Sequence, residues 1–152
     1  MSLQLLPIGA DLESNQRFRQ HPYNQEVLEQ TIAFFARIGY QPPWTGYFVE
    51  LDEQLVGSAA FKGAPVNGKV EIAYGVEPEH QQKGIGTQIC RALVELSLRT
   101  DPSVRVTART LPELNFSARL LQKNGFVLLG TVWDDEDGDV WEWEYIQTSP
   151  IS

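Results

Sequence analysis

The chain has 152 residues, a length that suits one domain over residues 1–152 and is short for two. Its formal net charge of -8 argues against nucleic-acid binding, which needs a basic surface, and either favours a cationic substrate or simply keeps the protein soluble. The sequence has no apolar run long enough to span a bilayer and no secretory leader, so we expect a cytoplasmic protein without a membrane partner.

The first half of the chain consists of short apolar runs separated by turn residues. Apolar residues at helical spacing predict a helix that stops before Gly39. The segments Asp52 to Gln54 and Asn67-Gly68 are typical of turns between strands. The expected elements are a strand at 3–8, a helix over 27–38, and strands at 47–51, 55–62 and 69–76.

The second half begins after Pro78, which ends the preceding strand. Thr110-Leu-Pro-Glu113 has the pattern of a capping box and predicts the start of a helix that closes at Asn124-Gly125. Asp137-Gly138 predicts a hairpin turn. The expected elements are helices over 82–98 and 110–125 and strands at 104–109, 126–133 and 140–146. Strand-helix-strand units among hairpins indicate a mixed sheet with helices packed on it, an α/β (α+β) fold.

The cysteine and histidine content offers no disulfide and no metal site. Cys90 is the only cysteine, and its apolar neighbours in a predicted helix favour a buried side chain over a reactive thiol. His21 and His80 each stand alone, so no zinc-ligand pattern can be drawn. We therefore expect no metal and a reducing compartment.

The segment from Glu71 to Thr87 carries the chemistry, because a strand runs through a short glycine loop into a helix. Gly84 and Gly86 let the backbone turn sharply and approach a ligand, while the first helical amides have no internal acceptor. Such amides bind anionic phosphate, and Lys83 adds positive charge. A P-loop pattern is absent, and a dinucleotide fingerprint fails because Ile89 stands where a third glycine is needed.

The same loop, Gln81-Gln-Lys-Gly84-Ile-Gly86, resembles the GNAT superfamily of acyl-CoA-dependent N-acetyltransferases, which has Gln/Arg-x-x-Gly-x-Gly/Ala before a helix. A second block, from Ser117 to Phe126, is similar to the segment after the fifth strand in the ribosomal-protein N-terminal-acetyltransferase branch (RimJ/RimL type). The resemblance covers about residues 44–145. It implies a mainly antiparallel sheet of six to seven strands, helices on both faces, and acetyl-CoA as co-substrate.

The resemblance also assigns residues to the cofactor. The fourth strand splays from the fifth, its edge pairs with the pantetheine arm, and the loop amides hold the diphosphate. The family often has Asn where Leu114 stands, and Asn115 lies one place later. The implied cofactor-binding residues are Val76, Gln81, Gln82, Lys83, Gly84, Ile85, Gly86, Thr87 and Asn115.

Acyl transfer needs a neutral amine, yet a lysine-like amine is only about 0.1% neutral at pH 7, so a general base helps. By the resemblance this base is Glu71, directly or through water, although an alternating strand also explains an exposed glutamate. An α-amine is already about a tenth neutral and depends less on a base. The family's proton-donating tyrosine is replaced by Leu121, which leaves Ser117 and Tyr74 as substitutes or as ordinary packing residues.

The acceptor site is expected opposite the cofactor entry. Trp44 and Tyr47 are candidates to line it, and the acidic turn 134–139 is either an attraction for a cationic amine or a solvated turn. One strand face is predicted to pack in the core and not to line the site, because it carries aromatic residues at alternate positions: Trp141, Trp143 and Tyr145.

The function predicted from the sequence is an N-acetyltransferase that moves an acetyl group from acetyl-CoA to a primary amine of a small molecule or a peptide N-terminus, by direct transfer in a ternary complex. A homodimer is an open expectation. The alternatives are a GNAT-like module that binds acyl-CoA without turnover, and an acidic interaction protein with no cofactor.

Overall fold

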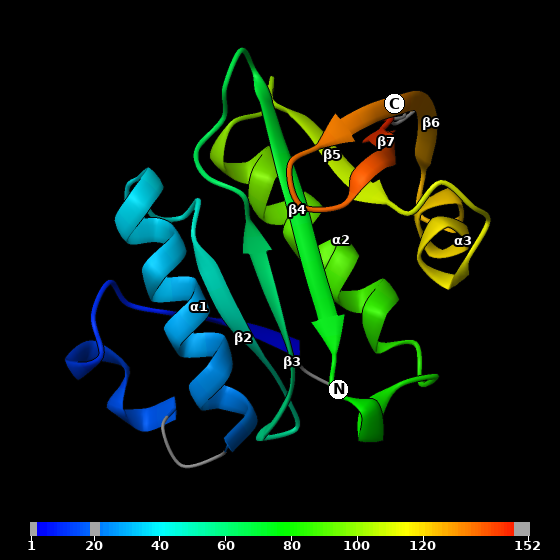
Figure 1. Ribbon diagram of the computed structural model, residues 1–152. Helices are drawn as coiled ribbons and strands as arrows, with labels where there is room; N and C mark the ends of the chain where they lie inside the picture. Colours follow the sequence, from blue (N-terminus) through cyan, green and yellow to red (C-terminus); the bar gives the residue numbers. More distant parts are fainter. Residues whose placement is uncertain (1–2, 19–21, 148–152) are drawn as a thin grey trace.

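One seven-stranded sheet organises the residues that the computed structural model describes, 3–18 and 22–147 (Figure 1). Its strand order is β1-β2-β3-β4-β5-β7-β6, and every neighbouring pair is antiparallel except β4 and β5, which are parallel. The predicted mixed, mainly antiparallel sheet is therefore confirmed. The strands are β1 (Leu3–Pro7), β2 (Gly46–Leu51), β3 (Gln54–Phe61), β4 (Lys69–Val76), β5 (Arg105–Thr110), β6 (Phe126–Asp134) and β7 (Gly138–Tyr145).

Helices cover both faces of the sheet. In Figure 1 α1 lies in front of the strands and α2 behind them. Because strand residues alternate between faces, Phe48 of β2 packs with Leu28 of α1, while its neighbour Val49 joins the cluster that includes α2. The helices are α1 (Pro22–Ile38), α2 (Ile85–Thr100) and α3 (Phe116–Lys123), with 3-10 turns η1 (Glu13–Phe18) and η2 (Pro78–His80). None of these described helices is long and apolar enough to cross a membrane.

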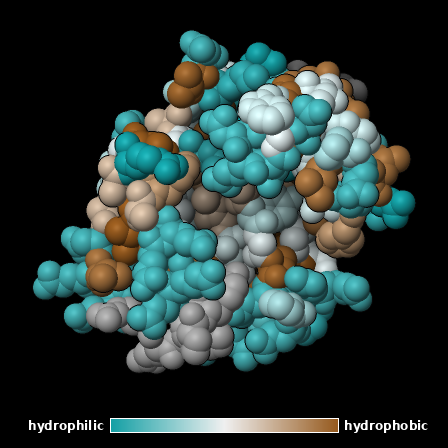
Figure 2. Space-filling model, viewed as in Figure 1, coloured by the Kyte–Doolittle hydropathy of each residue, from teal (hydrophilic) through white to brown (hydrophobic). Residues whose placement is uncertain are grey.

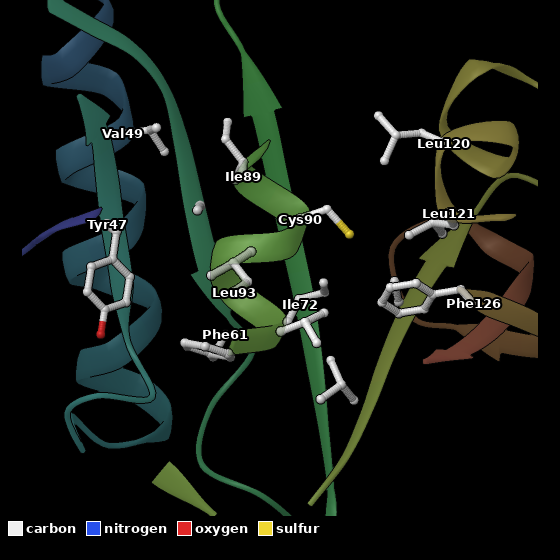
Figure 3. Packing of buried hydrophobic residues seen from close by; sticks show 14 of the residues in the cluster. Tyr47, Val49, Phe61, Ile72, Ile89, Cys90, Leu93, Leu120, Leu121 and Phe126 are labelled. Carbon is white, nitrogen blue, oxygen red and sulfur yellow. The ribbon is translucent and has the colours of Figure 1, made fainter. Parts of the chain in front are cut away.

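The larger core lies between the sheet and α2 (Figure 3). Ile89, Cys90 and Leu93 of α2 are fully buried against Ile72 of β4 and Phe61 of β3. The prediction that Cys90 is a buried packing residue is confirmed, and burial raises the pKa of its thiol to about 11. Trp143, predicted to belong to the core, is 1% exposed.

The predicted capping box at Thr110 is wrong. Thr110 is the last residue of β5, and its hydroxyl accepts a hydrogen bond from Nε1 of Trp143 at 3.0 Å and donates to the Leu111 carbonyl. The helix begins later, at Phe116, where the Asn115 side chain accepts from the Ala118 amide at 2.9 Å. A contact with a distant tryptophan thus uses the hydroxyl that the local pattern assigned to a cap.

β4 and β5 are paired only along the first half of β4. Their pairing runs from Lys69 with Arg105 to Ile72 with Ala108. Beyond it, β4 continues to Val76 with only β3 as partner. The edge of β4 that faces β5 is therefore open from residue 73 to residue 76, which agrees with the predicted splay.

Trp143→Phe should lower the free energy of unfolding by about 2 kcal/mol, because the indole fills the core and its N–H satisfies Thr110. Trp133→Phe is the matched control on the same hairpin, since Trp133 is 71% exposed and its change should stay within about 0.5 kcal/mol. Urea unfolding followed by circular dichroism measures both. Equal losses in the two variants would contradict this account of the core.

Candidate active site

A cleft of about 480 Å³ opens where β4, α2 and α3 converge; we call it the α2 cleft. One wall is the open edge of β4, another is the loop that enters α2, and the third is the first turn of α3. It lies directly beyond the point where β4 loses β5 as a partner. Its lining consists of Tyr74, Gly75, Val76, His80, Gln81, Gln82, Gly84, Ile85, Gly86, Thr87, Phe116, Ser117 and Leu120.

The loop before α2 is shaped for a ligand by two left-handed residues. Gln82 has φ 63° and Gly84 has φ 77°, and Gly84 precedes α2 without any side chain capping the helix. α2 starts at Ile85, later than the predicted residue 82. The amides of its first turn therefore lack intrahelical acceptors at the mouth of the cleft, an arrangement that binds anions.

Gly86 keeps the cleft open and lets two helices meet. A Cβ at this position would lie 3.0 Å from Cδ1 of Leu120 in α3 and 3.9 Å from Cγ2 of Val76. Any side chain here would extend into the space between α2, α3 and β4. The residues present therefore fit a ligand whose anionic part approaches the backbone closely.

The α2 cleft has almost no charge of its own. Lys83, predicted to supply positive charge, is exposed on the loop but is not part of the lining. The described lining contains one histidine, His80, and no lysine, arginine, aspartate or glutamate. Gln81 donates from Nε2 to the Val76 carbonyl at 3.1 Å and so ties the loop to the end of β4. Anion binding in this cleft therefore depends on backbone amides.

Asn115 and Ser117 have different roles at the start of α3. The Asn115 side chain is engaged as the N-cap of α3, and Asn115 does not line the cleft. Ser117 is exposed and lines it. Leu121, which occupies the position of the family's tyrosine, is 2% exposed and lies in the core.

A second hollow of about 310 Å³ lies on the opposite face of β4, against α1; we call it the α1 hollow. Figure 2 shows the hollowed centre of this face, with a pale floor and a hydrophilic rim. The α1 hollow and the α2 cleft share Tyr74 and Gly75, so the two meet at this part of β4. Every lining residue is uncharged: Val27, Thr31, Tyr47, Ser58, Ala59, Ala60, Ala73, Tyr74 and Gly75.

Gly75, which borders both spaces, is packed closely against β3. Gly57 of β3 lies beside Gly75 so closely that a Cβ at Gly57 would stand 2.2 Å from the Gly75 carbonyl oxygen. A Cβ at Gly75 itself would meet nothing within 4 Å. The β3 backbone therefore lies directly beside Gly75, and no side chain stands within 4 Å of the position that a Cβ of Gly75 would take.

The predicted aromatic candidates are mostly packing residues. Trp44 is 9% exposed, packs edge-on against Phe61 with ring centroids 5.1 Å apart, and lines neither space. Tyr47 borders the α1 hollow, but its hydroxyl donates to the Pro43 carbonyl at 2.6 Å, and burial raises its pKa to about 12. Burial also raises the pKa of Tyr74, whose phenol lies near the Cys90 thiol.

Glu71 lies on the same face of β4 as Ala73 and Gly75, in a neighbouring charged hollow. Its carboxylate is 3.6 Å from Nε of Arg109. Burial is the main cause that raises the pKa of Glu71, and the positive charges of Arg109 and Lys62 oppose it. The result is a half-buried carboxylate that binds a proton more readily than an exposed one.

Arg109 is a site residue that the sequence reasoning missed. Besides Glu71, it binds Oδ2 of Asp134 at 3.0 Å and lies 3.9 Å from Oε2 of Glu142. The Glu136 amide and Arg109 together lower the pKa of Asp134. The first carboxylate of the acidic turn is therefore occupied within the protein. The alternating pattern of residues 104–109 did not indicate that Arg109 would contact carboxylates from three other strands.

No group of three or more His, Cys, Asp or Glu side chains that could hold a metal ion occurs in the described part of the chain. His21 lies outside it.

Comparison with known proteins gives one family and one curated relative. A family model described as acetyltransferase (GNAT) domain matches residues 5–127. The uncharacterized N-acetyltransferase YjdG of Bacillus subtilis (strain 168) is 32% identical over 76 residues, which cover 49% of this chain and 45% of that protein. The chain thus matches less than half the length of this curated relative.

Solved structures share the fold at lower identity. RimL, a ribosomal L7/L12 alpha-N-protein acetyltransferase in complex with coenzyme A, has a TM-score of 0.69 at 19% identity, covering 96% of this chain and 94% of that one. AAC(6')-Ib in complex with paromomycin and acetyl-CoA has a TM-score of 0.70 at 23% identity, covering 97% and 94%. A spermidine N-acetyltransferase SpeG chimera from Vibrio cholerae and hSSAT reaches 0.70 at 17% identity, covering 97% and 96%. The predicted fold is confirmed.

Asn115→Ala should lower the free energy of unfolding by about 1 kcal/mol, because it removes the N-cap of α3. Asn115→Asp keeps a cap acceptor and should lose much less. Urea unfolding separates the two variants. Because the Asn115 side chain is used to cap α3, neither change should weaken ligand binding in the α2 cleft by more than about twofold, a loss below about 0.5 kcal/mol. A larger loss of binding in both variants would show that Asn115 contacts the ligand.

Proposed function

Since this chain belongs to the family of acetyltransferase (GNAT) domains, we propose that it is a single-domain enzyme that transfers an acetyl group from acetyl-CoA directly to a primary amine. One observation carries the proposal: the α2 cleft and the α1 hollow meet at Tyr74 and Gly75, on opposite faces of β4. The thioester enters from one face and the amine from the other, so both bind at once in a ternary complex.

The α2 cleft holds the co-substrate. The backbone from Ala73 to Val76 has no strand partner on the β5 side, and apart from the Val76 carbonyl, which accepts from Gln81, it pairs with the pantetheine arm. The amides of Ile85, Gly86 and Thr87 bind the diphosphate, with Gln81, Gln82 and Gly84 shaping the loop. Each such contact contributes about 0.3–1 kcal/mol, and more where it is partly buried. Lys83 attracts the diphosphate from outside the cleft.

The amine nitrogen attacks the thioester carbonyl carbon, loses a proton, and displaces the thiolate of CoA, which takes up a proton. Glu71 is the general base. Its Cα lies about 13 Å along β4 from that of Gly75, at about 3.3 Å per residue, so the proton reaches the carboxylate through water. Arg109 holds that carboxylate in place.

Ser117 is the proposed proton donor to the departing thiolate, because it is exposed and lines the α2 cleft. Tyr74 is the weaker candidate, since its phenol lies near the Cys90 thiol of α2. The buried Leu121 at the tyrosine position supports a second candidate function, an acyl-CoA-binding module without turnover.

The acceptor carries its amine on a short uncharged group, because the α1 hollow is lined by small neutral residues such as Ala60 and Ala73. A positive charge farther along the acceptor would meet Glu71 and Glu142 in the neighbouring hollow, which supports a cationic substrate. We also propose a cytoplasmic location, consistent with the free thiol of Cys90. A homodimer would form at the edge strand β6, which exposes Val127, Leu128 and Leu129, and sedimentation of the purified protein tests it.

Release of the CoA thiol in the presence of an amine panel tests the function. The panel contains short peptides with a free α-amine, lysine, spermidine and paromomycin, and at least one acceptor should produce thiol above the background hydrolysis. Binding of acetyl-CoA without acceptor-dependent release would favour the non-catalytic module. An absence of binding at millimolar acetyl-CoA would overturn both functions.

Gly84→Asp tests whether the loop before α2 binds the diphosphate. Gly68→Asp is its control, because both glycines have φ 77° and open space around a Cβ. Both substitutions should lose a similar stability, about 1 kcal/mol. Only Gly84→Asp puts a carboxylate beside the diphosphate, so calorimetry should show its Kd for acetyl-CoA rising about tenfold or more, while the Kd of Gly68→Asp stays within about twofold. If both variants have the same Kd for acetyl-CoA, the loop at Gly84 does not bind the diphosphate.

Glu71→Gln should reduce kcat/KM about 100-fold for a lysine-like amine and less than about tenfold for an α-amine, because only the former is nearly all protonated at pH 7. In the wild type, activity should fall as the pH drops through the pKa of Glu71, which burial raises, because only the ionised carboxylate is a base. The variant should lack this limb of the profile. Glu144→Gln, on β7 outside this hollow, is the control and should change neither kcat/KM by more than about twofold. Equal small losses for both acceptors would remove Glu71 from the mechanism.

A further inference from the structure

Phe116 is a large aromatic side chain at the mouth of the α2 cleft. It is 71% exposed although it belongs to the lining. Leu111 and Leu114, on the segment that leads to it, are 50% and 54% exposed. Neither the core nor the proposed mechanism uses these side chains. An exposed aromatic ring in the lining of a pocket indicates a surface that binds an apolar or planar part of a ligand.

The position of Phe116 is fixed by its neighbours. It is the first residue of α3, directly after the Asn115 cap. One turn later Leu120 is 8% exposed and lies against α2 at Gly86. The start of α3 therefore stands opposite the start of α2 and presents the ring from a rigid helix.

The part of the co-substrate that contacts the Phe116 ring follows from the path of CoA through the cleft. This step rests on the proposed function. The thioester lies at Gly75, where the α2 cleft meets the α1 hollow, and the diphosphate lies at the start of α2. The nucleoside of CoA must then leave the cleft at its outer end, where Gln82 and Gly84 are exposed. Phe116 belongs to the lining of the same cleft and is 71% exposed, so its ring can meet a group that leaves the cleft. Tyr74, the other residue of the lining with a phenyl ring, lies at the inner end on β4.

We propose that Phe116 is the platform on which the adenine base of CoA stacks. The purine face and the phenyl ring are both flat and poorly hydrated, so stacking removes both from water. Because the lining of the cleft contains no permanently charged side chain, this contact supplies binding that electrostatics do not.

The test compares acetyl-CoA with acetyl-4'-phosphopantetheine, which has the same thioester arm and lacks the nucleoside. Phe116→Ala should raise the Kd of acetyl-CoA about 5- to 150-fold, the range that base stacking on an aromatic ring gives per base, and leave the Kd of the truncated thioester within about twofold. Phe116→Trp should restore binding of acetyl-CoA. In turnover, Phe116→Ala should raise the KM for acetyl-CoA and leave kcat unchanged.

Trp133→Ala is the control for removal of an exposed aromatic ring, since Trp133 is also 71% exposed but lies on β6, outside the cleft. It should change neither Kd. Thermal unfolding of both alanine variants checks that they fold. If Phe116→Ala affects the two thioesters equally, or affects neither, the stacking role is wrong while the proposed function stands. If the wild-type chain binds neither thioester, the proposed function fails and this inference fails with it.

Discussion

The separation of β4 from β5 is the constraint on which the site depends. The two strands pair in parallel only from Lys69 to Ile72, and β4 then continues alone on that side. A parallel pair requires a crossover helix between its strands, and here that helix is α2. The chain must therefore leave β4 at its open end and begin α2 nearby. This connection brings the glycine loop and the free amides of the helix next to the unpartnered edge of β4.

Charge is distributed unevenly over this acidic protein. The α2 cleft is lined by uncharged side chains and His80, and the α1 hollow is wholly uncharged. The carboxylates gather instead around Arg109, which joins β4, β6 and β7 through Glu71, Asp134 and Glu142. The net charge of -8 therefore says little about the lining of these two spaces. The negative charge comes from carboxylates elsewhere on the protein and not from the lining of the two spaces.

The sequence predicted the order of elements and the glycine loop because these depend on local patterns: alternation, helical spacing and glycine at left-handed positions. It failed where distant residues decide. The Thr110 hydroxyl looked like a cap, yet it binds a tryptophan that is 33 residues away in sequence. Trp44 looked like a pocket residue, but it packs on Phe61 in the core. The meeting of two spaces at Gly75 depends on residues from α1, β2, β3, β4, α2 and α3, and no local motif records it.

The close approach of Gly57 to Gly75 has a consequence for how such an enzyme diversifies. In the proposed function the amine occupies the α1 hollow and reacts beside Gly75, so side-chain changes elsewhere in that hollow would enlarge, narrow or recharge the acceptor space without changing the close backbone contact of Gly75 with Gly57. Thr31, Ser58 and Ala60 are free to vary in this sense, since each borders only the α1 hollow. Acceptor choice can therefore drift by single substitutions while the reaction geometry stays in place.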